Sequence, residues 1–446
     1  MFPSLITRTR VPKDLAWVTA TNTRAEVDPA SVDVEPAGVA QVWSAVERLY
    51  RSGIHPAIQL CVRRHGEVLI DRAIGHAAGN GPDDPPHGRK VPLTPATPFN
   101  IFSASKAVTA MLVHHLAEQR LVHLTDPVCE YIPEFGAQGK DAITIQHVLT
   151  HRAGIPNMSA ETMRLETLEH DEEILQHLYS ARPIWRPGRR LAYHAITGGF
   201  ILAEIIRRVT GKPIRTMLRD TILAPLGFRW MNYGVAPRDV SKVAVNYFTG
   251  PPLLPPLSTM LERALGLPMH QVITLTNDAR FLTAVVPAGN VVSTANELSR
   301  FYQLLLNGGV LDGVQVFEPR TIRRAVQEHS YLEFDLTLVL PLRYAMGFML
   351  GGSTLSLYGP DTSAAFGHLG FTNIISWADP ERQIAGSLMT SGKPLIYPEL
   401  YFLHDIMWTI GRVCTKTAPR DPRSTPRRLR ARTGRARPVR RRAARR

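Results

Sequence analysis

A serine followed three residues later by a lysine, at the start of an apolar helical run, is the feature that most constrains this chain. Residues 103–106 read Ser-Ala-Ser-Lys and lead directly into the apolar run 107–113. At this spacing Ser103 and Lys106 lie on one face of a helix, one turn apart. The free N–H groups and the positive dipole end of the helix favour negative charge beside Ser103. The arrangement predicts a Ser/Lys pair for acyl transfer.

The Ser-x-x-Lys pattern alone also has an ordinary explanation. With 20 Ser and 8 Lys in 446 residues, chance gives about 0.4 copies of the pattern, and the chain contains one. In that reading Ser103 caps a buried helix and Lys106 is exposed in its first turn. Two observations favour the catalytic reading: lysine is scarce beside arginine, and the apolar run would bury Lys106. Burial lowers the pKa of a lysine and suits it to proton transfer.

The composition is that of an ordinary globular protein. It is 44% hydrophobic and 20% charged, and the length suits one large domain or two interleaved domains. Cys61, Cys129 and Cys414 are far apart, which predicts free thiols in a reducing compartment and no zinc site. The N-terminus lacks an apolar signal segment, and no run approaches the ~18 apolar residues of a membrane span. We therefore expect a cytoplasmic protein with no transmembrane segment, no cofactor and no metal.

The formal net charge of +14 belongs almost entirely to the C-terminal tail. Residues 416–446 carry a net +13, with Asp421 as the single acidic residue, which leaves +1 for the rest of the chain. The tail has no apolar face, so we expect residues 415–446 to be disordered. It also lacks the aromatic residues that bind single strands by stacking. We favour a solvated extension without a specific role, and we expect non-specific binding of polyanions.

Strands are predicted near both ends of the chain, and helices between them. Residues 57–64 and 67–72 are apolar runs around His65-Gly66, which predicts a β-hairpin. Later strands are expected at 343–350, 364–368, 372–377 and 383–390. Helices are expected at 39–50, 161–180, 196–210, 296–307 and 399–413. This order predicts an α+β fold, with an antiparallel sheet built from the N- and C-terminal segments, flanked by helices, and an inserted, mostly helical domain.

The expected domain boundaries follow from this order. Residues 1–36 form an irregular N-terminal arm, and residues 37–100 and 285–414 form the α/β sheet domain. Residues 101–284 form the mostly helical domain that carries the nucleophile. Within it, the segment 251–267 is rich in Pro and Leu. It either lines an apolar acyl pocket, forms a lid, or packs as an ordinary insert, and we favour the last.

The chain resembles the serine β-lactamase and penicillin-binding-protein-like superfamily, especially class C β-lactamases and family VIII carboxylesterases. The resemblance runs from about Val39 to Val413 and rests on short motifs in the expected order. The motifs are Ser-x-x-Lys at 103–106, two scaffold stretches at 124–128 and 143–156, Tyr-His-Ala at 193–195 in the place of Tyr-x-Asn, and Gly-His-Leu-Gly-Phe at 367–371 in the place of Lys-Thr-Gly or His-x-Gly. The order of the motifs makes coincidence a poor explanation.

The resemblance implies a division of labour in the site. Ser103 would form an acyl-enzyme, and Lys106 and Tyr193 would share the role of general base. Tyr193 would act as a phenolate, or as a proton shuttle held by Lys106. Taken alone, a tyrosine such as Tyr193 is usually an ordinary core or surface residue, and its assignment depends on its place beyond Pro187-Gly188 in the motif order.

The resemblance also implies an oxyanion hole and a substrate contact. The backbone N–H groups of Ser103 and Phe371 would bind the carbonyl oxygen, and Gly370 would let that backbone come close. His368 would form a hydrogen bond near the substrate carboxyl or leaving group, although a strand histidine with a purely structural role is the alternative. His147 and His151 are spaced like paired metal ligands, but no third ligand follows, so we expect them to belong to the scaffold.

Two positions depart from the β-lactamase pattern. Ala195 replaces the Asn that binds the amide side chain of the antibiotic, and His368 replaces a lysine and thus removes a fixed cation. With the missing export signal, these departures favour a carboxylesterase or lipase-like hydrolase that acts on a neutral small-molecule ester. The alternatives are a β-lactamase or D-amino-acid peptidase-type hydrolase, and a catalytically silent binding member of the family. A Ser/His/Asp hydrolase is disfavoured because the chain has no Gly-x-Ser-x-Gly motif.

Overall fold

The computed structural model describes most of the chain between residues 6 and 418. Within these limits it leaves out residues 159–163, 170, 253, 256–257, 260–261, 263–266, 355, 372 and 396–399. The predicted disorder of the Arg-rich tail falls almost wholly outside the described residues. Among the helices described, none has both the length and the apolar character needed to cross a lipid bilayer.

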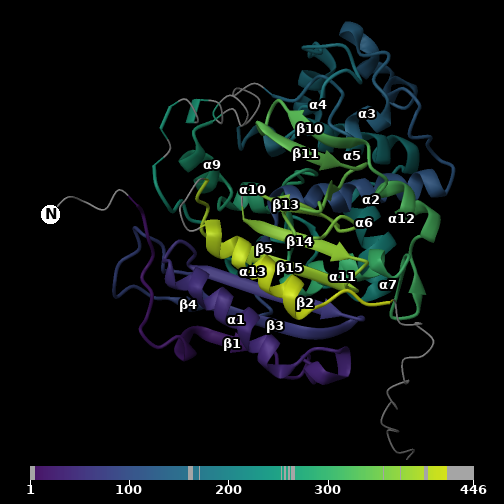
Figure 1. Ribbon diagram of the computed structural model, residues 1–446. Coiled ribbons are helices and arrows are strands. Elements are labelled where there is room, and N and C mark those ends of the chain that lie inside the picture. The colour runs from purple at the N-terminus through teal and green to yellow at the C-terminus, as the bar shows by residue number, and fades with distance from the viewer. Residues whose placement is uncertain are drawn as a thin grey trace, which may run out of the picture.

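An antiparallel ten-stranded sheet forms the centre of the molecule (Figure 1). Its order is β1-β3-β2-β15-β14-β13-β12-β11-β10, and β4 pairs with β3 outside this path. The strands from the first quarter of the chain are β1 (Thr19–Thr21), β2 (Ala57–Arg64), β3 (Glu67–Ala78) and β4 (Val91–Pro92). Those from the last third are β10 (Ser330–Asp335), β11 (Leu340–Tyr344), β12 (Met349–Leu350), β13 (Phe366–Gly370), β14 (Ile374–Asp379) and β15 (Ile384–Thr390). Because β2 pairs with β15, the two ends of the chain share one sheet, as predicted.

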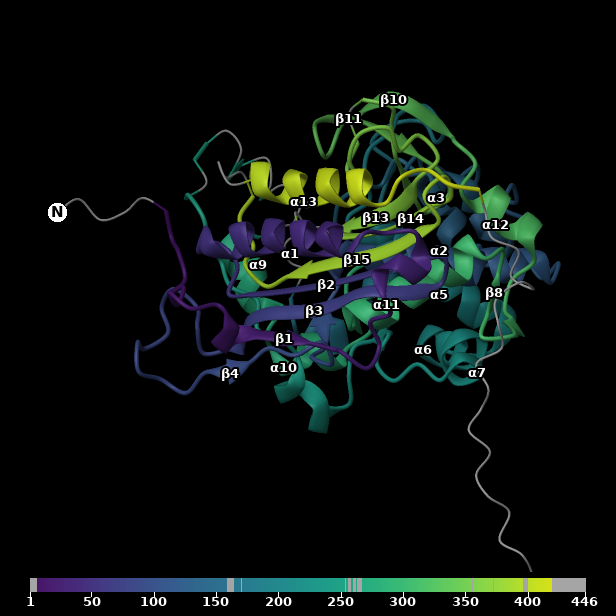
Figure 2. The same ribbon diagram turned by 60° about the horizontal axis from the view of Figure 1, so that its bottom comes forward.

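Helices cover both faces of this sheet. Helices α1 (Pro36–Arg51) and α13 (Leu400–Val413) lie side by side over one face, and α11 (Ala295–Leu306) packs on the other (Figure 2). Side chains of β15 alternate between the two faces of the sheet. Ile384 and Leu388 pack in the core beneath α1 and α13, whereas Ala385 and Met389 pack in the core on the other face. This double cover explains why all eight residues of β2 are buried.

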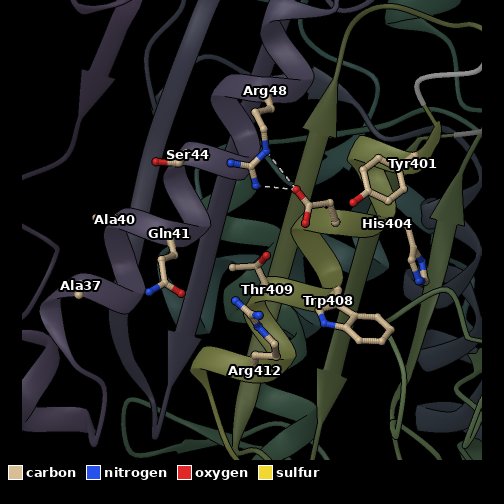
Figure 3. Close-up of a pocket in the computed structure, with 11 residues that line it drawn as sticks. Ala37, Ala40, Gln41, Ser44, Arg48, Tyr401, His404, Trp408, Thr409 and Arg412 are labelled. Carbon is tan, nitrogen blue, oxygen red and sulfur yellow. Dashed lines mark hydrogen bonds and ion pairs between the residues drawn. The ribbon is translucent and has the colours of Figure 1, made fainter.

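The two helices α1 and α13 are also joined at their outer surface. Arg48 on α1 and Asp405 on α13 form an ion pair at 2.6 Å across a shallow groove (Figure 3). Val42, Val46 and Leu49 of α1 face the sheet, as their spacing predicts. The sheet and these two helices thus form a layered support for the rest of the molecule.

The middle of the chain supplies the remaining helices. These are α2 (Ser105–Glu118), α3 (Ile145–Leu149), α4 (Asp171–Ser180), α5 (Thr197–Thr210), α6 (Ile214–Leu218), α7 (Ala224–Leu226), α9 (Met269–Leu275), α10 (Ala279–Thr283) and α12 (Pro319–Ala325). Short strands β5 (Phe99–Asn100), β6 (Asn232–Tyr233) and β7 (Val291–Ser293) form a second sheet, and β8 (Val310–Leu311) pairs with β9 (Val314–Gln315). Helix α2 packs against β13, α5 and α12, so its apolar run is buried on nearly every side.

Three predictions about the elements need correction. The run 343–350 is not one strand, because β11 ends at Tyr344, Gly347 turns the chain with φ = 96°, and β12 begins at Met349. The N-terminal arm is not irregular throughout, because residues 19–21 pair with β3. The predicted helix 161–180 is described as an α-helix only in α4, from Asp171, and part of the remainder lies outside the described residues.

Candidate active site

The structure brings Ser103 and Lys106 together. Ser103 lies in a 3₁₀ turn, Phe102–Ala104, that leads into α2, and Lys106 stands on the first turn of that helix with 8% of its surface exposed. Lys106 Nζ donates a hydrogen bond to Ser103 Oγ at 3.2 Å. It also donates to the carbonyl oxygens of Ala195 at 2.7 Å and Ala288 at 3.1 Å. The predicted pair is therefore fixed by three hydrogen bonds.

Burial lowers the pKa of Lys106 to about 7. Its three hydrogen-bond partners are uncharged, so no carboxylate compensates the desolvation of the ammonium group. A lysine with a pKa near 7 is neutral in a large fraction of molecules at neutral pH. It can therefore accept a proton from Ser103.

Tyr193 lies beside this pair, in the segment before α5. Lys106 Nζ is 4.7 Å from the centre of its ring. Burial raises the pKa of Tyr193 above its ordinary value, and hydrogen bonding with Ser103 offsets only part of this effect. Tyr193 is thus a neutral phenol at neutral pH. Of its two predicted roles, this favours the proton shuttle over the phenolate.

A buried carboxylate that sequence analysis missed holds the segment carrying Tyr193. Asp335, at the end of β10, is fully buried. Its Oδ1 accepts the N–H group of Tyr193 at 3.1 Å, and those of Thr337 and Leu338 at 2.8 and 2.9 Å. The one signal for this residue in the sequence is a lone acidic side chain within the apolar run 334–342.

Gly370 and Phe371 lie beside the nucleophile, at the end of β13. A Cβ atom on Gly370 would sit 2.2 Å from the carbonyl oxygen of Ile101, so only glycine permits this approach of the two backbones. The rings of Phe102 and Phe371 are 5.1 Å apart. Phe102 and Phe371 also have left-handed backbones, with φ values of 49° and 56°, a strained conformation that concentrates at functional sites.

His368 is near Tyr193, but it does not line the cavity beside Ser103. The two ring centres are 6.3 Å apart, and the side chain is 1% exposed. Its Nδ1 is hydrogen-bonded to the carbonyl oxygen of Leu369 at 2.7 Å. Burial, assisted by the charge of Lys106, lowers the pKa of His368 to about 3. The ring is therefore neutral at neutral pH, and its contact with substrate stays a prediction.

An apolar cavity of about 120 Å³ opens beside Ser103. Apart from Ser103 and Phe371, its wall is made mainly of aliphatic and aromatic side chains, including Leu165, Leu168, Leu267, Val272, Leu275, Phe281 and Val286. Leu267 belongs to the Pro- and Leu-rich segment 251–267, about half of which lies outside the described residues. Such a wall fits an apolar acyl group.

His147 and His151 have partners other than a metal. His147 forms a capping box with Thr144 at the start of α3. The ring of His151 lies 4.6 Å from that of Tyr193, and its Nδ1 accepts the N–H group of His194 at 3.2 Å. In the part of the chain that the structure describes, no group of three or more His, Cys, Asp or Glu residues could hold a metal ion.

Comparison with known proteins shows the family of this chain. The family model named Beta-lactamase matches residues 44–399, which is most of the chain. The chain belongs to the beta-lactamase family. It is 29% identical over 305 residues to the esterase/beta-lactamase LipL of Mycobacterium tuberculosis, in an alignment that covers 65% of this chain and 68% of the relative.

Solved structures of this family share the fold. A penicillin-binding protein homolog from Caulobacter crescentus has a TM-score of 0.72 and 27% identity, covering 85% of this chain and 98% of its own. A family VIII carboxylesterase has a TM-score of 0.71 and 25% identity, covering 84% and 97%. The predicted α+β fold is confirmed, and this member of the beta-lactamase family is a serine hydrolase.

Proposed function

We propose that this beta-lactamase family member hydrolyses carboxylic esters through an acyl-enzyme on Ser103. The observation that carries the proposal is the hydrogen bond from Lys106 Nζ to Ser103 Oγ at 3.2 Å, made by a lysine whose pKa is lowered to about 7. The names of the esterase relative and the carboxylesterase neighbour support an ester as the substrate.

In the acylation step, Ser103 Oγ attacks the carbonyl carbon of the ester while its proton passes to neutral Lys106, directly or through the hydroxyl of Tyr193. The negative charge on the carbonyl oxygen is stabilised by the N–H groups of Ser103 and Phe371. The tetrahedral intermediate then collapses, the bond to the alcohol oxygen breaks, and the alcohol leaves with a proton returned through Tyr193 or Lys106. The acyl group stays on Ser103.

In the deacylation step, water takes the place of the alcohol. Lys106, with Tyr193, removes a proton from the water as its oxygen attacks the acyl carbon. The carboxylic acid leaves and Ser103 regains its proton. Tyr193 is a neutral phenol that can both donate and accept, which suits a shuttle between Ser103 and Lys106.

The site favours a neutral ester with an apolar acyl group. The cavity beside Ser103 is lined mostly by apolar side chains, and Arg164 is the one charged residue among its described lining. His368 supplies no positive charge at neutral pH, because burial holds its pKa near 3. Ala195 contributes a backbone carbonyl to Lys106 and has no amide side chain for a β-lactam.

β-Lactam hydrolysis is the second candidate, because the relative LipL carries both activities in its name. A series of p-nitrophenyl esters of increasing acyl length, measured beside a chromogenic cephalosporin, separates the two. We expect kcat/KM for the best ester to exceed that for the cephalosporin by at least about 100-fold. The site has Ala195 in place of the Asn that binds the amide side chain of the antibiotic, and the loss of such a polar contact has an effect of that size. The ester optimum should lie at short acyl groups, given the 120 Å³ cavity. Equal efficiency on the cephalosporin would contradict the ester assignment.

A further inference from the structure

Exposed apolar side chains are concentrated on the β10–β11 hairpin. Of the sixteen large apolar side chains exposed among the described residues, seven lie within residues 331–340. These seven are Tyr331, Leu332, Phe334, Leu336, Leu338, Val339 and Leu340. Exposed apolar side chains scattered singly are ordinary, whereas a contiguous group marks a binding surface. We call residues 331–340 the hairpin patch.

The hairpin patch continues across a cleft to helix α13. The cleft has a volume of about 540 Å³, and its wall is mostly aliphatic, with Leu332, Leu340, Leu342, Leu350, Leu357 and Leu369 among its residues. On the far rim, Leu400 and Tyr401 are 48% and 68% exposed. Figure 2 shows β10 and β11 at the end of the sheet beside α13. The groove between α1 and α13 differs, because the Arg48–Asp405 ion pair crosses it (Figure 3).

Positive charge flanks the hairpin patch. The segment 182–190 carries four exposed arginines, Arg182, Arg186, Arg189 and Arg190, and no acidic residue. The next residue, Leu191, accepts the N–H group of Leu336 with its carbonyl oxygen at 3.1 Å. This segment therefore runs directly beside the tip of the hairpin. The acidic residues of β10 do not neutralise the positive charge of segment 182–190, because Glu333 is paired with Arg152 and Asp335 is buried.

We propose that the hairpin patch docks this protein on the surface of an anionic lipid bilayer. The apolar side chains of the hairpin would enter the interface, while Arg186, Arg189 and Arg190 would contact the headgroup phosphates. An apolar surface beside a cluster of cations is the combination that interfacial binding to anionic lipid uses. The proposal goes beyond ester hydrolysis and does not depend on it.

A second copy of this chain is the other occupant to weigh, because β10 is an edge strand and exposed edges pair with one another. The edge is irregular, however. The pairing of β10 with β11 shifts register between Ser330 and Glu333, and Leu332 has φ = 47°, so a continuous ladder is interrupted there. The exposed arginines of residues 182–190 are complementary in charge to lipid phosphates.

Sedimentation of the full chain with phosphatidylcholine vesicles containing phosphatidylglycerol tests the proposal at 0.1 M and 0.5 M salt. The wild type should bind at both, because apolar insertion is not screened, whereas attraction by the Arg-rich tail weakens steeply with salt. The double variant Leu338→Asp/Leu340→Asp should bind at least about 10-fold more weakly at 0.5 M salt. The control Leu121→Asp, at a leucine that is 46% exposed and outside the hairpin patch, should bind like the wild type.

Three outcomes overturn the proposal. In the first, the double variant unfolds at the wild-type temperature and binds vesicles as the wild type does. In the second, all binding disappears at 0.5 M salt, which assigns it to the tail. In the third, the wild type binds no vesicles but self-associates in size-exclusion chromatography, and the double variant is monomeric, which assigns the surface to a second copy. If the double variant does not fold, Leu338→Ser supplies the same comparison, and Arg189→Glu/Arg190→Glu tests the charged flank at 0.1 M salt.

Discussion

Lys106 and Tyr193 share one buried environment, and it moves their pKa values in opposite directions. Burial disfavours the charged form of each group, so it lowers the pKa of Lys106 to about 7 and raises that of Tyr193. The lysine is thereby available as a base, and the tyrosine keeps its proton. The two shifts together assign the titrating role to Lys106 and a transfer role to Tyr193.

The pH dependence of kcat/KM tests this assignment. Lys106 must be neutral to accept the Ser103 proton, so kcat/KM of the wild type should rise with pH and level off above about 7. Lys106→Ala and Tyr193→Phe should each cost at least about 100-fold. The rise near pH 7 should persist in Tyr193→Phe, measured on its residual activity. Loss of that rise in Tyr193→Phe, with its retention in Lys106→Ala, would instead make Tyr193 the base.

The sequence alone predicts some of these residues better than others. Ser103 and Lys106 follow from local helix geometry, because four consecutive residues contain the whole pattern. Tyr193 depends on the order of motifs along the chain. Asp335 was not predicted, because its contact with Tyr193 joins positions 142 residues apart. The assignment of catalytic roles to these residues stays a proposal.

At the scale of elements, the β10–β11 hairpin connects the molecular surface to the site through Asp335. Asp335→Ala removes the carboxylate oxygen that accepts the N–H groups of Tyr193, Thr337 and Leu338, so these three donors lose their hydrogen-bond partner. We expect unfolding free energy, measured in urea, to fall by about 1–3 kcal/mol. Because Tyr193 would also lose its position, kcat should fall while KM changes little.

Asp335→Asn is the matched control for this prediction. The amide oxygen of asparagine can still accept these N–H groups, so the variant should recover much of the lost kcat. If Asp335→Ala is destabilised but keeps the kcat of the wild type, Asp335 supports the fold alone and does not position Tyr193.

The predicted helices and strands agree with the structure where the hydrophobic pattern extends over many consecutive residues. The helices α1, α5, α11 and α13 lie close to their expected ranges, and the hairpin of β2 and β3 is confirmed. The short strand β1 was not predicted, because its three residues are specified by pairing with β3 rather than by their own pattern. The domain boundaries stay a prediction.

At the scale of the whole molecule, buried neutral histidines make stability depend on pH. Burial lowers the pKa of His55, His194 and His368 to about 3 and that of His114 to about 4. In the unfolded chain each titrates near ~6.5. Below that pH the unfolded state binds more protons, so the free energy of unfolding falls by about 1.4 kcal/mol per pH unit for each such histidine. The lowered pKa of Lys106 likewise makes the free energy of unfolding fall as the pH is lowered from about 10.5 to 7.

Urea unfolding at pH 8, 7, 6 and 5 measures this dependence. As the pH is lowered, stability should decline gently from pH 8 to 7 and steeply below about pH 6. His114→Gln should reduce the steep slope by about 1.4 kcal/mol per pH unit, because it removes one of the titrating groups. An unfolding free energy that stays constant from pH 7 to 5 would show that these histidines do not differ between the folded and unfolded states.

The central claim is that Ser103 is the nucleophile, and intact-mass spectrometry after treatment with a fluorophosphonate tests it most directly. The wild type should gain the mass of one probe and lose p-nitrophenyl ester turnover in parallel. Ser103→Ala should gain none and show no turnover, whereas Ser105→Ala, at the other serine of the same motif, should still be labelled. An adduct that survives in Ser103→Ala, or a folded wild type that takes up no probe and hydrolyses no ester, would contradict the account.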